Sequence, residues 1–209
     1  MNFKPLKYVY IASENKNATT LLLLHGTGGD ENDLIPIARD FGTDFNILSV
    51  RGNVSENGMP RFFKRLGMGI FDEKDLDFRT EELVAFIKVI SEEKGFDPTK
   101  IIALGYSNGA NIVGAILAKY PNLLFGAILY RPMQPFKSMP DFRNDTNTRV
   151  FISSGAYDNT VNPDDTLQYV GILKNAGFEV SHFELKAMHG LTAEDISLTN
   201  DWLNTNGNA

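Results

Sequence analysis

The sequence contains no cysteine and only three histidines in 209 residues. Without cysteine, the chain cannot form a disulfide framework, a thiolate zinc site or a cysteine nucleophile. It also contains no His-Glu-x-x-His pattern or similar ligand spacing, so we expect neither a metal nor a cofactor. Because the histidines are so few, each can be weighed separately as a catalytic base.

Charge and hydropathy exclude further classes of protein. The formal net charge is −6 and the isoelectric point is near 5.1, which argues against nucleic acid or an anionic membrane as the main partner. No apolar stretch approaches the roughly 20 residues that span a bilayer, and the first residues lack the pattern of a signal peptide. We therefore expect a cytoplasmic protein without stable membrane insertion, folded as one domain over residues 1–209.

Apolar runs typical of strands alternate with helical patterns along the chain. The strands are expected at 7–12, 19–24, 46–50, 101–104, 124–129, 149–153 and 178–185. Helices are expected near 34–41, from 83 to about 95, from 109 to about 121, from 162 to about 177 and over 192–204. This alternation predicts an α/β fold with a mostly parallel sheet of about seven strands and helices on both faces. Residues 51–77 are glycine-rich and are predicted to form a long irregular loop.

The strongest motif is Gly105-Tyr106-Ser107-Asn108-Gly109, which follows four apolar residues and precedes a helical pattern of small residues. This Gly-x-Ser-x-Gly pattern between a strand and a helix is typical of a nucleophile elbow. The two glycines are expected to keep the sharp turn free of side chains that would collide with its other arm. We therefore expect Ser107 to be exposed at the end of the strand as a nucleophile.

Two further polar side chains follow predicted strands at the same edge of the sheet. Asp158 comes shortly after the strand at 149–153, and His189 follows the strand at 178–185. The carboxyl ends of parallel strands share one edge, so these residues can meet Ser107 there. His189 lies in a predicted loop, which would let its imidazole swing over the nucleophile and accept the serine proton. Asp158 would orient the imidazole.

The other candidates for these two roles have simpler explanations. His25 lies in a glycine loop, where a structural role is expected, and His182 lies inside a strand. Asp164 and Asp165 fit the first turn of a helix that begins after Asn162, although Asp164 stays an alternative to Asp158.

Acyl transfer also requires N–H donors that face the oxyanion of the tetrahedral intermediate. The elbow would supply the backbone N–H of Asn108, and the glycine-rich loop after the strand at 19–24 would supply that of Thr27. A phosphate-binding loop is the alternative interpretation of this segment. The segment lacks the Gly-Lys-Ser/Thr ending of such loops, and Asp30 and Glu31 would repel phosphate.

Several segments together resemble the bacterial phospholipase/carboxylesterase branch of the α/β hydrolases, which includes the acyl-protein thioesterases. They are His25-Gly26-Thr27-Gly28-Gly29-Asp30, Gly105 to Asn111, Ser154 to Asp158, Met188-His189-Gly190, and Arg51-Gly52 with Asn57 to Arg65. The resemblance implies a metal-independent serine carboxylesterase with the α/β-hydrolase fold and no separate lid domain. It places the triad on Ser107, Asp158 and His189. Two departures put a thioesterase-like preference in doubt, because Asn108 stands where those enzymes usually carry Gln, and Phe62-Phe63 where they carry Trp.

The expected substrate is a small or medium acyl ester. Phe62, Phe63, Met133 and Met188 are candidates to line its site, because methionine adapts to loosely specified apolar ligands. Arg61, Lys64 and Arg65 are interpreted as a solvated basic face rather than as an anion site. Exposed apolar loops also allow a homodimer, and the sequence leaves the oligomeric state open.

Two other functions remain open from the sequence. One is hydrolysis of a thioester, lysophospholipid, lactone or peptide on the same triad, because these reactions share nucleophile and oxyanion site. The other is a non-catalytic protein of the same fold that binds a small ligand.

Overall fold

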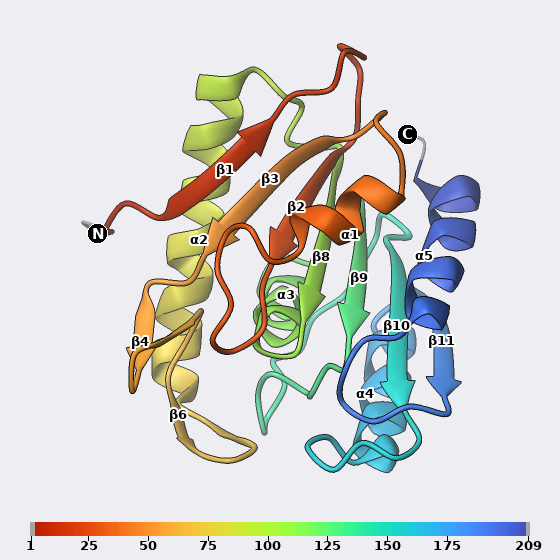
Figure 1. Cartoon of the computed structure of the whole chain (residues 1–209). Coiled ribbons are helices and arrows are strands. Elements are labelled where there is room, and N and C mark those ends of the chain that lie inside the picture. The colour runs from red at the N-terminus through yellow and green to blue at the C-terminus, as the bar shows by residue number, and fades with distance from the viewer. Residues whose placement is uncertain (1–2, 208–209) are drawn as a thin grey trace.

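Seven strands form the central sheet in the computed structural model, which describes residues 3–207 (Figure 1). In their spatial order the strands are β1 (Lys7–Ile11), β3 (Asn46–Arg51), β2 (Thr20–Leu24), β8 (Ile101–Tyr106), β9 (Gly126–Tyr130), β10 (Arg149–Gly155) and β11 (Glu179–Leu185). Only β1 runs antiparallel to its neighbour, and every other pair in this sheet is parallel. The predicted α/β-hydrolase fold with a mostly parallel sheet is confirmed.

Helices cover both faces of the sheet (Figure 1). They are α1 (Ile35–Asp40), α2 (Glu73–Lys94), α3 (Asn108–Lys119), α4 (Pro163–Asn175) and α5 (Ala193–Asn206). Side chains of α2, α3 and α4 pack in one core cluster, and those of α1 and α5 pack in the other. Strand β2 supplies both clusters, with Leu22 and Leu24 in the first and Leu21 and Leu23 in the second. This period of two explains why the strand reads as a continuous apolar run.

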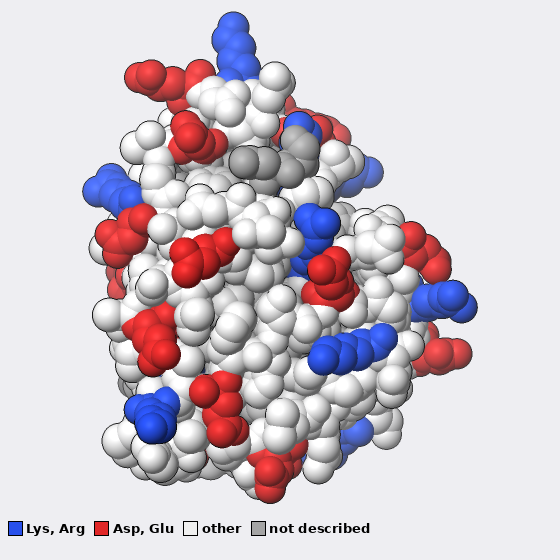
Figure 2. Space-filling view, turned by 90° about the vertical axis from the view of Figure 1, so that its right-hand side faces the viewer, with Lys and Arg blue, Asp and Glu red and all other residues white. Residues whose placement is uncertain are grey.

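The sheet ends at β11, an edge strand that carries the exposed residues Glu179 and Glu184. Charged side chains at an edge discourage pairing with a strand of another molecule. Figure 2 shows the side of the molecule with α5 and β11, where acidic and basic side chains are scattered among uncharged ones. Within residues 3–207, no helix is both long and apolar enough to cross a membrane.

The segment 51–77 differs from the predicted irregular loop. It forms two small hairpins, β4 (Val54–Glu56) with β5 (Met59–Arg61), and β6 (Arg65–Gly67) with β7 (Ile70–Phe71). The first hairpin turns at Asn57-Gly58, where both residues have positive φ angles of 51° and 84°. An Asn-Gly pair between short strands is the sequence signature of such a turn.

Helix α2 also begins ten residues earlier than predicted, because its first turns are stabilised by capping rather than by an apolar stripe. The Asp72 side chain accepts a hydrogen bond from the N–H of Asp75, and Glu73 and Asp75 place negative charge in the first turn. The buried stripe runs back from Leu83 to Leu76 through Thr80, whose hydroxyl donates to the Leu76 carbonyl. The polar Thr80 interrupts the apolar pattern in the sequence.

Candidate active site

Ser107 lies in a strained turn between β8 and α3. Its backbone has φ 52° and ψ −109°, a conformation that non-glycine residues rarely adopt. The Ser107 N–H donates to the Tyr130 carbonyl at 2.9 Å, and the Ser107 carbonyl accepts from the Asn111 N–H at 3.0 Å. These bonds to β9 and to α3 hold the strained residue in place, as is typical of functional sites.

The two glycines of the motif prevent different collisions. A Cβ atom on Gly105 would lie 2.5 Å from the Gly109 carbonyl oxygen, which is the collision across the turn expected from the sequence. A Cβ atom on Gly109 would instead lie 1.9 Å from the Leu24 carbonyl oxygen of the neighbouring strand β2. Gly109 therefore allows α3 to approach β2, which the motif alone does not reveal.

A chain of hydrogen bonds joins Ser107, His189 and Asp158. The distance from Ser107 Oγ to His189 Nε2 is 3.0 Å, and that from His189 Nδ1 to Asp158 Oδ2 is 2.8 Å. The other oxygen of Asp158 accepts from the N–H groups of Thr160 and Val161 at 2.7 and 3.0 Å. The structure thus brings together the three residues predicted as a triad, and the imidazole already lies against the serine without any loop movement.

The alternative histidines and acids lie in other contacts. His25 is buried, with Nδ1 2.6 Å from the Gly26 carbonyl oxygen and Nε2 accepting from the Gly52 N–H at 3.1 Å. His182 is partly buried on β11, where Nε2 contacts the Ser154 hydroxyl at 2.8 Å. Asp164 lies in the first turn of α4, where its N–H donates to the capping Asn162 side chain.

The two N–H groups predicted for the oxyanion site have no acceptor within residues 3–207. In the loop after β2, the N–H of Gly28 donates to the Pro60 carbonyl and that of Gly29 to the Gly26 carbonyl, which leaves the N–H of Thr27. The N–H of Asn108 belongs to the first residue of α3, where no helical acceptor exists. Both donors are therefore available to a substrate oxygen.

The predicted substrate residues separate into two groups. Phe62 and Phe63 are only 3% and 0% exposed and pack in the core, Phe62 against the His25 ring and Phe63 against the Phe71 ring. Their position corrects the expectation that they line a substrate site, because neither presents a surface to solvent. Met188, next to His189, is 59% exposed, and Met133 is partly buried after β9.

Arg61 is also placed differently from the prediction. It is 3% exposed and not part of a solvated basic face, because it lies beneath the loop after β2. Its Nη1 donates to the Thr27 hydroxyl at 2.6 Å, and its Nε donates to the Phe63 carbonyl at 3.1 Å. Arg61 thus joins the hairpin β4–β5 to the loop that carries the candidate oxyanion donor.

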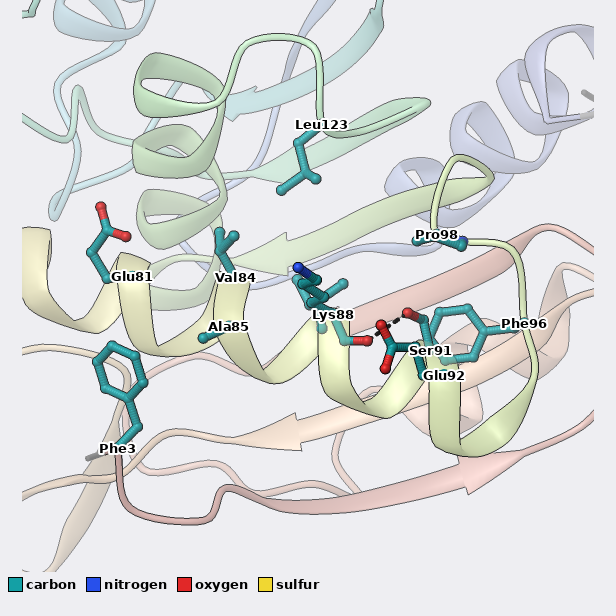
Figure 3. Close-up of a pocket in the computed structure, with 11 residues that line it drawn as sticks. Phe3, Glu81, Val84, Ala85, Lys88, Ser91, Glu92, Phe96, Pro98 and Leu123 are labelled. Carbon is teal, nitrogen blue, oxygen red and sulfur yellow. Dashed lines mark hydrogen bonds between the residues drawn. The ribbon is translucent and has the colours of Figure 1, made fainter. Parts of the chain in front are cut away.

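A groove lies beside α2 (Figure 3). It has a volume of about 470 Å³ and is lined by Phe3, several residues of α2, Pro98 and Leu123. Pro98 and Leu123 precede β8 and β9, whereas Ser107 follows β8. The groove therefore lies toward the amino ends of the strands, on the side opposite the serine.

Known proteins with similar sequences are hydrolases. The chain is 42% identical over 199 residues to "Putative hydrolase MhqD" of Bacillus subtilis (strain 168), an alignment that covers 94% of this chain and 97% of that protein. A crystal structure of a Bacillus cereus carboxylesterase superposes with a TM-score of 0.93 at 42% identity, and the match covers 96% of this chain and 94% of that one. The structure of YahD, solved with malic acid, gives a TM-score of 0.90 at 31% identity over 97% and 100% of the two chains. No protein-family model matches the chain.

The chain belongs to the phospholipase/carboxylesterase family of α/β hydrolases. It is a carboxylic ester hydrolase. In this carboxylesterase, Asn108 connects the elbow to the hairpins, because its side-chain oxygen accepts from the Phe62 N–H at 2.7 Å. Asn108 thus makes a hydrogen-bonded connection between the elbow and the segment that follows β5.

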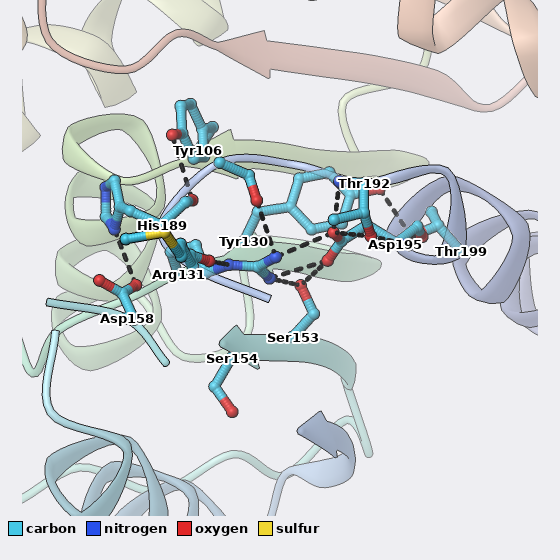
Figure 4. A network of polar contacts seen from close by, with 12 residues as sticks. Tyr106, Tyr130, Arg131, Ser153, Ser154, Asp158, His189, Thr192, Asp195 and Thr199 are labelled. Carbon is cyan, nitrogen blue, oxygen red and sulfur yellow. Dashed lines mark hydrogen bonds and ion pairs between the residues drawn. The ribbon is translucent and has the colours of Figure 1, made fainter. Parts of the chain in front are cut away.

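Sequence reasoning missed Arg131 and Asp195 of this carboxylesterase, which form a fully buried ion pair beside His189 (Figure 4). Burial raises the pKa of the Asp195 carboxyl, but the hydrogen bonds from Arg131 and Ser153 outweigh it and lower the pKa overall. Two signals in the sequence point to this pair. Arg131 directly follows the buried strand β9 at the catalytic edge, and Asp195 stands three residues after the helix-capping Thr192.

Proposed function

We propose that this carboxylesterase cleaves small to medium acyl esters through a covalent acyl-enzyme on Ser107. The observation that carries the proposal is the hydrogen-bonded chain from Ser107 Oγ through the His189 ring to Asp158 Oδ2, with distances of 3.0 and 2.8 Å. A serine hydroxyl is a poor nucleophile until an adjacent base accepts its proton.

In the first half of the proposed reaction, Ser107 Oγ attacks the ester carbonyl while its proton moves to His189 Nε2. The Asp158 carboxylate, 2.8 Å from Nδ1, stabilises the imidazolium as it forms. The tetrahedral intermediate collapses when the imidazolium returns its proton to the departing alcohol oxygen. The C–O bond to the alcohol breaks, and the acyl group stays on Ser107.

In the second half, water replaces the alcohol. His189 accepts a proton from the water as its oxygen attacks the acyl carbonyl, and it then returns that proton to Ser107 Oγ. The acid leaves and the free enzyme is restored. In both halves the N–H groups of Thr27 and Asn108 would donate to the oxyanion, and the loss of one such donor typically costs about 3 kcal/mol.

We assign the acyl group of the substrate to a cavity next to Met133. The cavity has a volume of about 280 Å³, and Phe71, Met133 and Phe136 line it together with charged and polar residues that include Glu73 and Asp165. The Met133 N–H donates to the Asn111 side chain, and Asn111 in turn donates its N–H to the Ser107 carbonyl. Since ligand pockets commonly measure roughly 300–1,000 Å³, this volume supports a small or medium acyl chain.

Substitution of Ser107 tests the proposal. We expect Ser107→Ala to lose turnover of p-nitrophenyl butyrate and labelling by a fluorophosphonate, because both require the Oγ nucleophile. Ser154→Ala is the matched control, because Ser154 contacts His182 on β11 and not His189.

Unchanged ester turnover in Ser107→Ala would refute the proposed mechanism. A wild-type protein that binds esters tightly, releases no alcohol and stays inert to the fluorophosphonate would instead be a ligand-binding member of the family.

A further inference from the structure

Arg131 is a fully buried arginine at the catalytic edge of the sheet. It is 0% exposed and directly follows β9, with its N–H donating to the Ser153 carbonyl of β10. Its φ angle is +54°, in the left-handed region that residues with side chains rarely adopt. A buried charge and a strained backbone thus occur together at one residue.

All five N–H groups of the Arg131 guanidinium have an acceptor (Figure 4). Two bond the Asp195 carboxylate at 2.8 and 2.9 Å, and one bonds the Ser153 hydroxyl at 2.8 Å. The remaining two bond backbone carbonyls of the loop that carries His189. No other side chain has five donors in a fixed planar arrangement.

The two carbonyls belong to the residues on either side of His189. Arg131 Nε lies 3.2 Å from the Met188 oxygen, and Nη2 lies 3.1 Å from the Gly190 oxygen. The carbonyl of His189 itself accepts from the Tyr106 hydroxyl at 3.2 Å. Burial raises the pKa of Tyr106, so this hydroxyl remains a donor. Three consecutive carbonyls around His189 are therefore fixed by side chains of β8 and of the residue after β9.

Stability alone does not account for this arrangement. A buried ion pair is commonly no more stabilising than well-packed apolar residues of similar size, because both charges lose their hydration. The guanidinium instead bonds the carbonyls on both sides of His189, which fixes the backbone that carries the imidazole. A general base must be held at the right distance from the hydroxyl, since a displacement of about 1 Å can cost about 100-fold in rate.

We propose that Arg131 is a positioning residue for His189, with Asp195 holding the guanidinium in place. This inference rests on the proposed role of His189 as the general base. Arg131 is fully buried, its guanidinium has no hydrogen bond to Ser107, and it would act through the backbone of the His189 loop. It therefore affects the turnover number, kcat, and leaves binding of the ester almost unchanged.

A double-mutant cycle between Arg131→Lys and His189→Ala tests the inference. Lysine keeps the positive charge beside Asp195 but has three donors from a single atom and cannot bond both carbonyls and the carboxylate. We expect Arg131→Lys to lower kcat about 100-fold with KM changed less than about threefold. If Arg131 acts through His189, the double variant loses no more activity than His189→Ala alone. If the loss of activity in the double variant equals the product of the losses in the two single variants, the inference is overturned.

If the lysine variant does not fold, a second variant provides the test. Arg131→Met combined with Asp195→Asn removes both charges together, so that no unpaired charge is buried. We expect the same loss in kcat, measured per site titrated with fluorophosphonate so that unfolded protein is not counted. A kcat within threefold of wild type in either folded variant would overturn the inference. Arg79→Lys, on the ion pair with Glu82 in α2, is the matched control and is expected to keep its kcat.

The same experiments separate this inference from the proposed function. If His189→Ala retains wild-type turnover, the proposed mechanism fails whatever Arg131 does. If His189→Ala is inactive while either folded Arg131 variant keeps a kcat within threefold of wild type, only the positioning role fails.

Discussion

The Asp158 side chain is only 1% exposed and accepts three hydrogen bonds. Two of them come from the backbone of the turn that follows, so the carboxylate keeps its place whatever the state of His189. A carboxylate held in this way fixes which imidazole nitrogen carries the proton. In the proposed mechanism, Asp158 therefore orients the imidazole of His189 and does not itself take up the proton.

Substitution of Asp158 measures that contribution. We expect Asp158→Asn to lower kcat about 10⁴-fold with little change in fold, because the amide oxygen can still accept the two backbone bonds while the tautomer of His189 changes. Steady-state kinetics on a p-nitrophenyl ester provide the measurement. Asp164→Asn, in the first turn of α4, is expected to retain wild-type kcat, and an equal loss in both variants would contradict the assignment.

At the scale of single residues, the sequence predicts which residues meet at the site better than it predicts which side chains are buried around them. The elbow motif, the strand ends and the few histidines were enough to choose the three residues that the structure brings into contact. Nothing in the sequence distinguishes a loop phenylalanine at the surface from Phe63 in the core, because both lie in an aromatic, glycine-rich stretch. Arg131 was missed since its acceptors are backbone carbonyls 57 and 59 residues away.

At the scale of secondary-structure elements, hydrogen bonds of the His25 ring hold the loop after β2 in place. The Gly52 N–H donates to Nε2, while Nδ1 must donate to the Gly26 carbonyl, so the ring is held in one neutral tautomer. Burial lowers the pKa of His25, and the Gly26 carbonyl, Asp33 and Asp30 oppose that change only in part. The ring therefore connects the loop bearing Thr27 to the chain that follows β3.

This arrangement predicts a loss of stability in mild acid. Because the pKa of His25 is lowered on folding, the unfolded chain binds its proton first, near the ordinary value of about 6.5. The stabilisation is present above that pH and declines as the pH falls toward the folded-state pKa, by at most about 1.4 kcal/mol per pH unit.

Urea unfolding between pH 8 and pH 5 provides the check. The free energy of unfolding of His25→Asn should fall less steeply with decreasing pH than that of the wild type. His182→Asn is run in parallel, because burial also lowers the pKa of His182. Identical slopes for wild type and His25→Asn would contradict the prediction.

Most of the elements follow from local sequence, and the exceptions have local causes. Apolar runs predicted the five inner strands β2, β3, β8, β9 and β10, because almost all of their residues are buried on both faces of the sheet. The hairpins β4–β5 and β6–β7 were missed, since strands of two or three residues are too short to show a period of two. The first turns of α2 were missed because capping, and not apolar periodicity, stabilises them.

In the whole molecule, the site is assembled at the carboxyl edge of the sheet from segments far apart in the chain. Residues that follow β2, β8, β9, β10 and β11 all contribute, and the hairpins and the start of α4 lie beside them. The cavity next to Met133 is lined by the hairpin β6–β7, the first residue of α2, the segment after β9 and the start of α4. Its size should therefore set the range of acyl chains.

Substitution of Met133 tests that relation. We expect Met133→Trp to fill part of the 280 Å³ cavity and to lower kcat/KM for p-nitrophenyl octanoate much more than for the acetate. The measurement is a series of chain lengths from two to ten carbons, with thioesters of the same acids to compare leaving groups. Leu167→Trp, at an exposed position of α4, is the control, and a uniform loss over all chain lengths would contradict the assignment of the cavity.

The acyl-enzyme itself is the most direct test of the account. Acid quenching during turnover of p-nitrophenyl butyrate, followed by trypsin and mass spectrometry, isolates the peptide 101–119, in which Ser107 is the only serine. We predict that this peptide gains the mass of one butyryl group and that His189→Ala prevents the gain. Turnover without any acylated peptide, or acylation on a different peptide, would contradict the central claim.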